Sequence, residues 1–169
     1  METKLIRKNI MKITIILFLA GTNCVSYSFR GGAFPEHTKT IHIPISDNQS
    51  TMYGLEQPLT SAVRNEFIKD GRLGLSDDQN ADLYLQLTIL SYAHEAYSYT
   101  AEEEVKEYQV TMNISVFYLD QLNGDTIWDD KVMVAKETYS AYNEDEEIGK
   151  NRVLEEFAKD LIPLMTENW

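Results

Sequence analysis

The sequence predicts an α+β domain in which two helices pack on one face of a four-stranded mixed sheet, in the order β-α-β-β-β-α. Three observations support this prediction. Apolar and polar residues alternate in four segments, and this period of two is typical of strands with one covered face. Two other segments repeat apolar residues every three or four positions, as amphipathic helices do. An Asn-Gly pair at 123–124 separates the last two strand segments and indicates a hairpin.

A basic and then apolar N-terminus precedes this domain and ends at the only cysteine of the chain, Cys24. Basic residues within 1–12 and an apolar run over 13–21 are the organisation of a secretory signal. The run is too short for a spanning helix, which needs about 20 apolar residues. We therefore predict that residues 1–23 are a lipoprotein signal peptide and that the Cys24 thiol is acylated.

Two details of this leader leave alternatives open. A typical lipobox has Leu three residues before the cysteine and a small residue directly before it, whereas Gly21 and Asn23 occupy these places. Ordinary signal cleavage near Ala20–Asn23 is therefore an alternative, and Met11 is an alternative start. A single cysteine cannot form an internal disulfide, and acylation would account for its presence in an exported protein. Val25 follows the cysteine instead of an aspartate, which favours the outer membrane.

Residues 24–37 are predicted to be an irregular tether, because glycine and proline interrupt every periodic pattern there. The folded domain then spans residues 38–169. Its first strand lies within 39–46, where three isoleucines occupy alternate positions. Pro44 cannot donate a hydrogen bond to a ladder, so we expect it at an edge or a bulge.

The first helix is predicted over residues 55–69. Its apolar stripe consists of Leu55, Leu59, Ala62, Val63 and Phe67. Pro58 fits this helix only in the first turn, where its missing N–H has no intrahelical partner. Gly71 is suited to end the helix.

Three strands follow, at residues 81–92, 108–119 and 126–139. In the first, one face is predicted to hold Leu83, Leu85, Leu87 and Ile89, and the other Tyr84, Gln86, Thr88 and Tyr92. In the second, one face holds Val110, Met112, Ile114, Val116 and Tyr118. In the third, the residues predicted to share a face are Trp128, Val132 and Val134. The polar stretch 100–104 marks the tip of a hairpin between the first two.

The second helix is predicted over residues 147–165. Its wide apolar stripe consists of Ile148, Val153, Leu154, Phe157, Ala158, Leu161, Ile162 and Met165. Pro163 removes one backbone hydrogen bond and is expected to kink or end this helix. We expect both stripes to cover the same face of the sheet, which leaves the other face wet.

The charge of the chain restricts its partners. The net charge is −12, and removal of residues 1–23 takes away four of the 15 basic residues and one of the 27 acidic residues. The remaining 11 basic and 26 acidic residues give a net charge of −15. Nucleic-acid binding is excluded, because phosphate contacts need clustered Lys and Arg. The charge also disfavours unaided attraction to anionic lipid headgroups.

The histidines do not form a metal-binding pattern. His37, His42 and His94 are far apart in the sequence and have no neighbouring cysteine or second histidine. Zinc sites require such clustering. We therefore predict no metal and no cofactor.

The acidic clusters are interpreted as structural features and not as catalytic or cation-binding sites. Glu102-Glu103-Glu104 is read as a solvated hairpin tip, and the acidic run 144–147 as a helix N-terminus favoured by the helix dipole. The second run lacks the glycine and spacing of an EF-hand loop. Asp129-Asp130 is interpreted as charge near an edge or turn instead of an acid–base pair. With no nucleophile motif or phosphate loop, we predict that the protein is not an enzyme.

Three tyrosines lie close to the predicted hairpin tip: Tyr92, Tyr97 and Tyr99. One interpretation is a contact patch for a partner protein, since tyrosine is enriched at interfaces. The other is cross-strand pairing within the sheet. The residues alone do not decide between them.

Several landmarks share an order and spacing with a known family. Those nearest the cysteine are Tyr27-Ser28-Phe29-Arg30-Gly31-Gly32 and Thr40-Ile41-His42-Ile43-Pro44-Ile45. Further along are Asn48, Gly54-Leu55-Glu56, Leu59-Thr60, Phe67, Ala81-Asp82-Leu83 and Gly124-Asp125-Thr126-Ile127-Trp128. No motif is specific by itself, but together they cover nearly the whole chain after Cys24. In this series the chain resembles the LptE family of lipopolysaccharide-assembly lipoproteins.

The resemblance implies two helices on a four-stranded sheet and a role inside the LptD outer-membrane β-barrel. There the lipoprotein acts as a plug and assists barrel assembly, anchored by its acyl chains at the periplasmic face of the outer membrane. Family members also bind lipopolysaccharide through basic residues, and the acidity of this chain leaves that open here. Two other functions remain as alternatives: an accessory lipoprotein of another envelope secretion or efflux complex, and a periplasmic ligand-binding domain.

Overall fold

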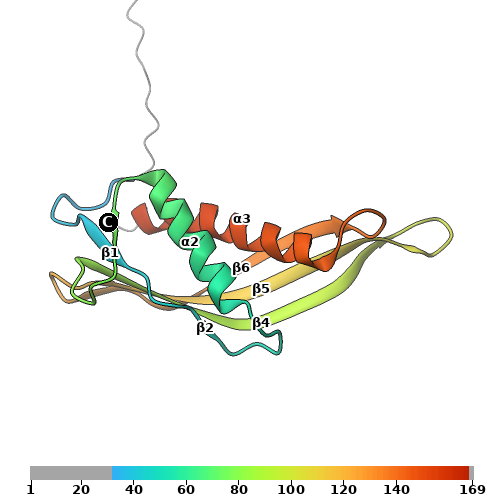
Figure 1. The fold of residues 1–169 in the computed structure, drawn as a ribbon, viewed down its shortest axis with the longest axis horizontal. Coiled ribbons are helices and arrows are strands. Elements are labelled where there is room, and N and C mark those ends of the chain that lie inside the picture. The colour runs from blue at the N-terminus through green and yellow to red at the C-terminus, as the bar shows by residue number, and fades with distance from the viewer. Residues whose placement is uncertain (1–31, 168–169) are drawn as a thin grey trace, which may run out of the picture. The chain divides into compact units, whose positions relative to one another are not determined.

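The computed structural model describes residues 32–167, so the signal segment and Cys24 lie outside the described part of the chain. Within these residues, two helices lie on one face of a six-stranded sheet (Figure 1). In chain order, the elements are β1 Thr40–His42, β2 Asp47–Asn48, α2 Glu56–Asp70, β3 Gly74–Ser76, β4 Leu83–Tyr99, β5 Val105–Asp120, β6 Asp125–Ser140 and α3 Glu146–Thr166. The predicted α+β class, with its helices on one sheet face, is confirmed.

The sheet has more strands than the four predicted. The strand order is β3-β1-β4-β5-β6, and β2 pairs with β4. The predicted first strand is divided into β1 and β2, and the gap between them includes Pro44, which has no N–H to donate. β1 pairs in parallel with both β3 and β4, so the predicted parallel relation across the first helix is confirmed. β3 was missed because three residues are too few to show a period.

The sheet is dominated by the antiparallel strands β4, β5 and β6. The alternation predicted for β5 is confirmed, because its predicted core-facing residues are all fully buried: Val110, Met112, Ile114, Val116 and Tyr118. The first half of β4 agrees as well, with Leu83, Leu85, Leu87 and Ile89 in the core. The predicted hairpin tip at 100–104 is the turn between β4 and β5.

A bulge in β6 overturns one prediction. Val116 pairs with Lys131 and Tyr118 pairs with Trp128, so β6 uses one residue more than β5 over this interval. The extra residue reverses the alternation. Trp128 is therefore in the core, whereas Val132 and Val134 are 53% and 56% exposed on the opposite face. Predicting that these three residues share a face was wrong because strict alternation was assumed across the bulge.

The helices begin and end close to the predicted positions. α2 has Pro58 in its first turn, and its C-cap Gly71 adopts a left-handed conformation with φ 70°. At the start of α3, the Asp145 side chain accepts a hydrogen bond from the Ile148 N–H at 3.0 Å. Pro163 does not end α3, which continues to Thr166.

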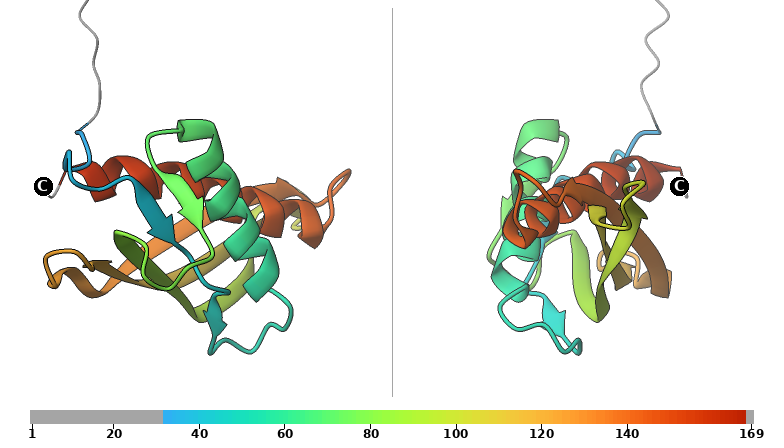
Figure 2. Two further views of the ribbon diagram at one scale, coloured as in Figure 1. Left: turned by 60° about the vertical axis from the view of Figure 1, so that its left-hand side comes forward. Right: turned by 90° about the vertical axis from the view of Figure 1, so that its right-hand side faces the viewer.

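The core lies between the helices and the sheet. α2 contributes Leu59, Thr60, Val63 and Phe67, while α3 contributes Gly149, Val153, Leu154, Phe157, Ala158, Leu161, Ile162, Met165 and Thr166. Figure 2 shows both helices on the same side of the sheet, so among residues 32–167 the opposite side carries no helix. In the described part of the chain, no helix is long and apolar enough to cross a membrane.

Candidate functional site

The β4–β5 hairpin extends past the N-terminal end of α3, and the predicted tyrosines lie along it (Figure 1). Ile89 pairs with Ile114 and Ser91 pairs with Asn113, so β4 contains an extra residue at Leu90. This bulge shifts the alternation, and Tyr92 pairs with the fully buried Met112 on the helix-facing side. Placing Tyr92 on the wet face was therefore wrong.

Tyr92 ties β4 to the first turn of α3. Its hydroxyl donates a hydrogen bond of 2.6 Å to a carboxylate oxygen of Glu146, and its ring packs against the core. Burial, together with this hydrogen bond and the charge of Glu146, raises the pKa of Tyr92 well above its usual range. These contacts define a structural role for Tyr92 inside the domain.

Three further rings surround this contact. His94 and Tyr108 have ring centroids 4.8 Å apart, and Tyr139 stacks on both at 5.7 and 5.6 Å. The Tyr139 hydroxyl and Nε2 of His94 are 2.6 Å apart, which is a hydrogen bond, and Nδ1 of His94 lies 3.7 Å from Glu146. Burial raises the pKa of Tyr139, and Glu146 adds to this effect. The cluster joins β4, β5 and β6 to the start of α3.

Tyr97 and Tyr99 differ from Tyr92 because both side chains are 59% exposed. Register irregularities between Ala96 and Tyr99 interrupt the regular pairing at this end of β4. The structure therefore separates the three tyrosines into one that packs under α3 and two that face solvent near the hairpin tip. Such irregularities cannot be located from side-chain alternation alone.

The acidic residues near the start of α3 form ion pairs with nearby basic residues or cap the helix. Glu144 forms a 2.7 Å ion pair with Arg152, Glu147 pairs with Lys150 at 2.6 Å, and Asp145 is the N-cap. Asp129 and Asp130 lie at the β6 bulge, where Asp130 has a positive φ of 53°. Within residues 32–167, no group of three His, Cys, Asp or Glu side chains could hold a metal ion.

At the opposite end of the domain, the described part of the predicted tether is fastened to the fold. Nε2 of His37 donates to the buried carboxylate of Asp120 at 2.8 Å. Asn123 donates to the same oxygen through its side chain, and its backbone N–H bonds the other oxygen. Burial opposes ionisation, but the bonds from His37 and Asn123 outweigh it and hold the pKa of Asp120 below its usual value. The Arg72 guanidinium stacks over Phe34 at 5.1 Å.

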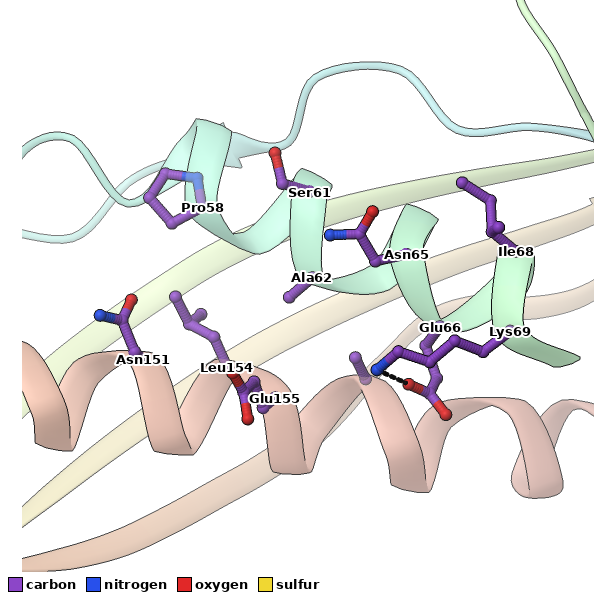
Figure 3. Close-up of a pocket in the computed structure, with 11 residues that line it drawn as sticks. Pro58, Ser61, Ala62, Asn65, Glu66, Ile68, Lys69, Asn151, Leu154 and Glu155 are labelled. Carbon is purple, nitrogen blue, oxygen red and sulfur yellow. Dashed lines mark hydrogen bonds and ion pairs between the residues drawn. The ribbon is translucent and has the colours of Figure 1, made fainter.

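A groove of about 510 Å³ runs between the two helices (Figure 3). The residues that line it include Pro58, Ser61, Asn65, Asn151, Leu154 and Glu155. The ion pair visible in it joins Lys69 and Glu66 at 3.0 Å, and both residues belong to α2. These side chains form no arrangement of nucleophile, base and acid, so the groove is a polar seam between the helices.

The helix-on-sheet arrangement is shared with solved bacterial proteins, among them two lipoproteins. A minor lipoprotein from Acinetobacter baumannii is 15% identical, with a TM-score of 0.50 over 79% of this chain and 95% of that chain. Rare lipoprotein B from Shewanella oneidensis is 14% identical, with a TM-score of 0.50 over 75% and 94%. PelC from Paraburkholderia phytofirmans is 17% identical, with a TM-score of 0.50 over 79% and 92%. At these identities, the likeness shows the fold.

The fold therefore defines a class of small α+β domains with two helices on one sheet face. No curated protein matches the sequence. The family model for LptE, described as lipopolysaccharide-assembly, matches residues 38–166, which is more than half of the chain. The chain belongs to the LptE family, as the order of its landmarks predicted.

Proposed function

We propose that the protein is an outer-membrane lipoprotein, acylated at Cys24, that occupies the lumen of the LptD β-barrel. Its role there is structural: it plugs the barrel and assists barrel assembly during lipopolysaccharide transport. The observation that supports this most strongly is the family match over residues 38–166. The role does not require a basic patch, so it is compatible with the net charge of −15 that remains after removal of residues 1–23.

The exposed hairpin tyrosines are the proposed contact with the barrel. Tyr97 and Tyr99 project from the end of a long hairpin, where their side chains can enter a partner without disturbing the core. Tyrosine combines a large apolar ring with a polar hydroxyl and is enriched at protein interfaces. Tyr92 belongs to the same strand, and its bond to Glu146 would keep the hairpin in position.

Co-purification with tagged LptD from solubilised outer membranes tests this proposal. The wild-type protein should be recovered with the barrel, and the Tyr97→Ser/Tyr99→Ser double variant should be recovered several-fold less. Tyr53→Ser is the matched control, because Tyr53 is 91% exposed and lies in the loop between β2 and α2. Absence of the barrel with wild-type protein, together with normal barrel assembly after depletion, would contradict the proposal.

The anchor needs a separate measurement. Mass spectrometry of the mature N-terminus should show an acylated Cys24, and Cys24→Ser should release the protein from the membrane. An unmodified N-terminus that begins before or after Cys24 would show ordinary signal cleavage instead.

A further inference from the structure

β6 is an edge strand of the sheet. The direction in which its backbone N–H and C=O groups point can be assigned for each residue. The Ala141 N–H donates to the Lys106 carbonyl at 3.0 Å, which fixes which residues of β6 bond to β5. In an antiparallel ladder such residues alternate with residues whose backbone groups point the other way. By this alternation, the N–H and C=O groups of Val132, Val134 and Lys136 point away from β5, toward the free edge.

Both ends of this edge are closed by the protein itself. At the C-terminal end, the Arg152 guanidinium donates to the Thr138 carbonyl, and Glu144 accepts a 2.7 Å hydrogen bond from the Ser140 N–H. At the other end, the bulge described above distorts the strand. Charged side chains and bulges are how natural sheets block edge pairing. Within the described residues, the open part of the edge is Val132–Lys136.

A groove runs beside this open part, between β6 and α3. Two cavities of about 450 and 280 Å³ both include Met133, Val134 and Asp160 in their walls, so they lie next to each other. Their walls also include the buried side chain of Phe157. α3 places Glu156 one turn before Asp160, and Lys136 is the basic residue among the groove walls. The groove is therefore apolar at its base and net negative at its rim.

We propose that the open edge of β6 accepts an extended strand from another protein, one in which apolar and basic residues alternate. Successive side chains of an added strand point to opposite faces. On the outer face its apolar residues would cover Val132 and Val134, which are 53% and 56% exposed. On the inner face its basic residues would lie beside Glu156 and Asp160, with their aliphatic stems in the groove.

Charge distinguishes this occupant from a second copy of the chain. The net charge of −12 opposes self-association. A basic strand instead brings positive charge beside Asp160 and beside Glu156, whose ion pair with Lys159 is exposed and 3.5 Å long. The inference goes beyond the proposed function, because it concerns a different surface from the hairpin tyrosines and does not require the barrel as the strand donor.

The test uses the purified full-length protein and a fluorescent heptapeptide of alternating valine and lysine, with fluorescence anisotropy as the readout. Val134→Pro removes one outward N–H without removing a bond to β5 and should weaken binding about tenfold or more. Val134→Ala is the matched control, because it keeps that N–H, and its affinity should change by about threefold at most. A valine–glutamate heptapeptide should bind about tenfold more weakly than the lysine peptide.

A second set of binding measurements changes the peptide and leaves the protein unchanged. N-methylation of every second amide in the lysine peptide, on the side that would face β6, should abolish binding, whereas methylation of the other amides should preserve it. Equal binding by both methylated peptides, by the Val134→Pro variant, or by the glutamate peptide would overturn the inference. Light scattering that shows a dimer, lost in Val134→Pro, would assign the edge to a second copy and overturn it as well.

Discussion

The Tyr92 hydroxyl is one of the groups that connect the hairpin to the helix layer. Tyr92→Phe deletes the 2.6 Å hydrogen bond to Glu146 and keeps the ring in place. We expect the free energy of unfolding to fall by about 1–2 kcal/mol, since the acceptor is a charged carboxylate. Urea denaturation measures this change. Tyr97→Phe is the control, because Tyr97 is exposed, and a loss as large as that of Tyr92→Phe would contradict the interpretation.

The same residue predicts a change of stability with pH. Burial and Glu146 raise the pKa of Tyr92 in the folded protein above the ordinary value of 10.0. The folded state therefore holds this proton more tightly than the unfolded state, so the contribution is complete below about pH 10 and decreases as the pH rises above it. Urea denaturation between about pH 8 and pH 11 should show a smaller alkaline loss in Tyr92→Phe than in the wild type. Identical slopes of the free energy of unfolding against pH in the two proteins would contradict the raised pKa of Tyr92.

At the scale of the elements, the stability of α3 depends on the cap at its N-terminus. The Asp145 carboxylate accepts the Ile148 N–H, which otherwise has no partner in the helix. Asp145→Ala should lower the free energy of unfolding by about 1 kcal/mol. Asp145→Ser should cause a much smaller loss, because serine is also a good N-cap. Thermal unfolding followed by circular dichroism compares the two variants. Equal losses would show that the cap contributes through charge alone.

α3 also lies very close to the sheet. A Cβ at Gly149 would come within 2.5 Å of the Tyr139 ring and 3.2 Å of a Val110 methyl group. Gly149 thus allows the first turns of the helix to rest on the aromatic cluster. This contact places Glu146 within reach of both Tyr92 and His94, so the cap, the glycine and the cluster hold one end of the domain together.

At the scale of the whole domain, Asp120 holds the opposite end. Asp120→Ala should free His37 and the turn after β5, with a loss of about 2–3 kcal/mol and faster hydrogen exchange at residues 34–38. Because the pKa of Asp120 is lowered in the fold, its contribution is present above the unfolded value near 3.8 and is lost as the pH falls below it. Unchanged exchange at residues 34–38 would contradict this role.

Periodicity predicted much of this fold because one face of the sheet and one stripe of each helix are buried. Val110 to Tyr118 in β5 and the buried stripe of α3 repeat with the periods that burial requires. The end of α2 at Gly71 follows from local backbone chemistry, because a left-handed C-cap favours glycine. β3 could not be predicted, since its pairing with β1 is set by tertiary contacts.

The sequence by itself determined the α+β class, the two helices, the three long strands and the family. Only the tertiary structure decided which side chains share a face beyond each bulge. One extra residue at Leu90 moved Tyr92 under α3, and one at the Asp129–Asp130 bulge turned Val132 and Val134 outward. Alternation has a period of two, so a single inserted residue reverses every later position. The site and the open edge of β6 therefore depend on register, which is set by pairing between distant strands.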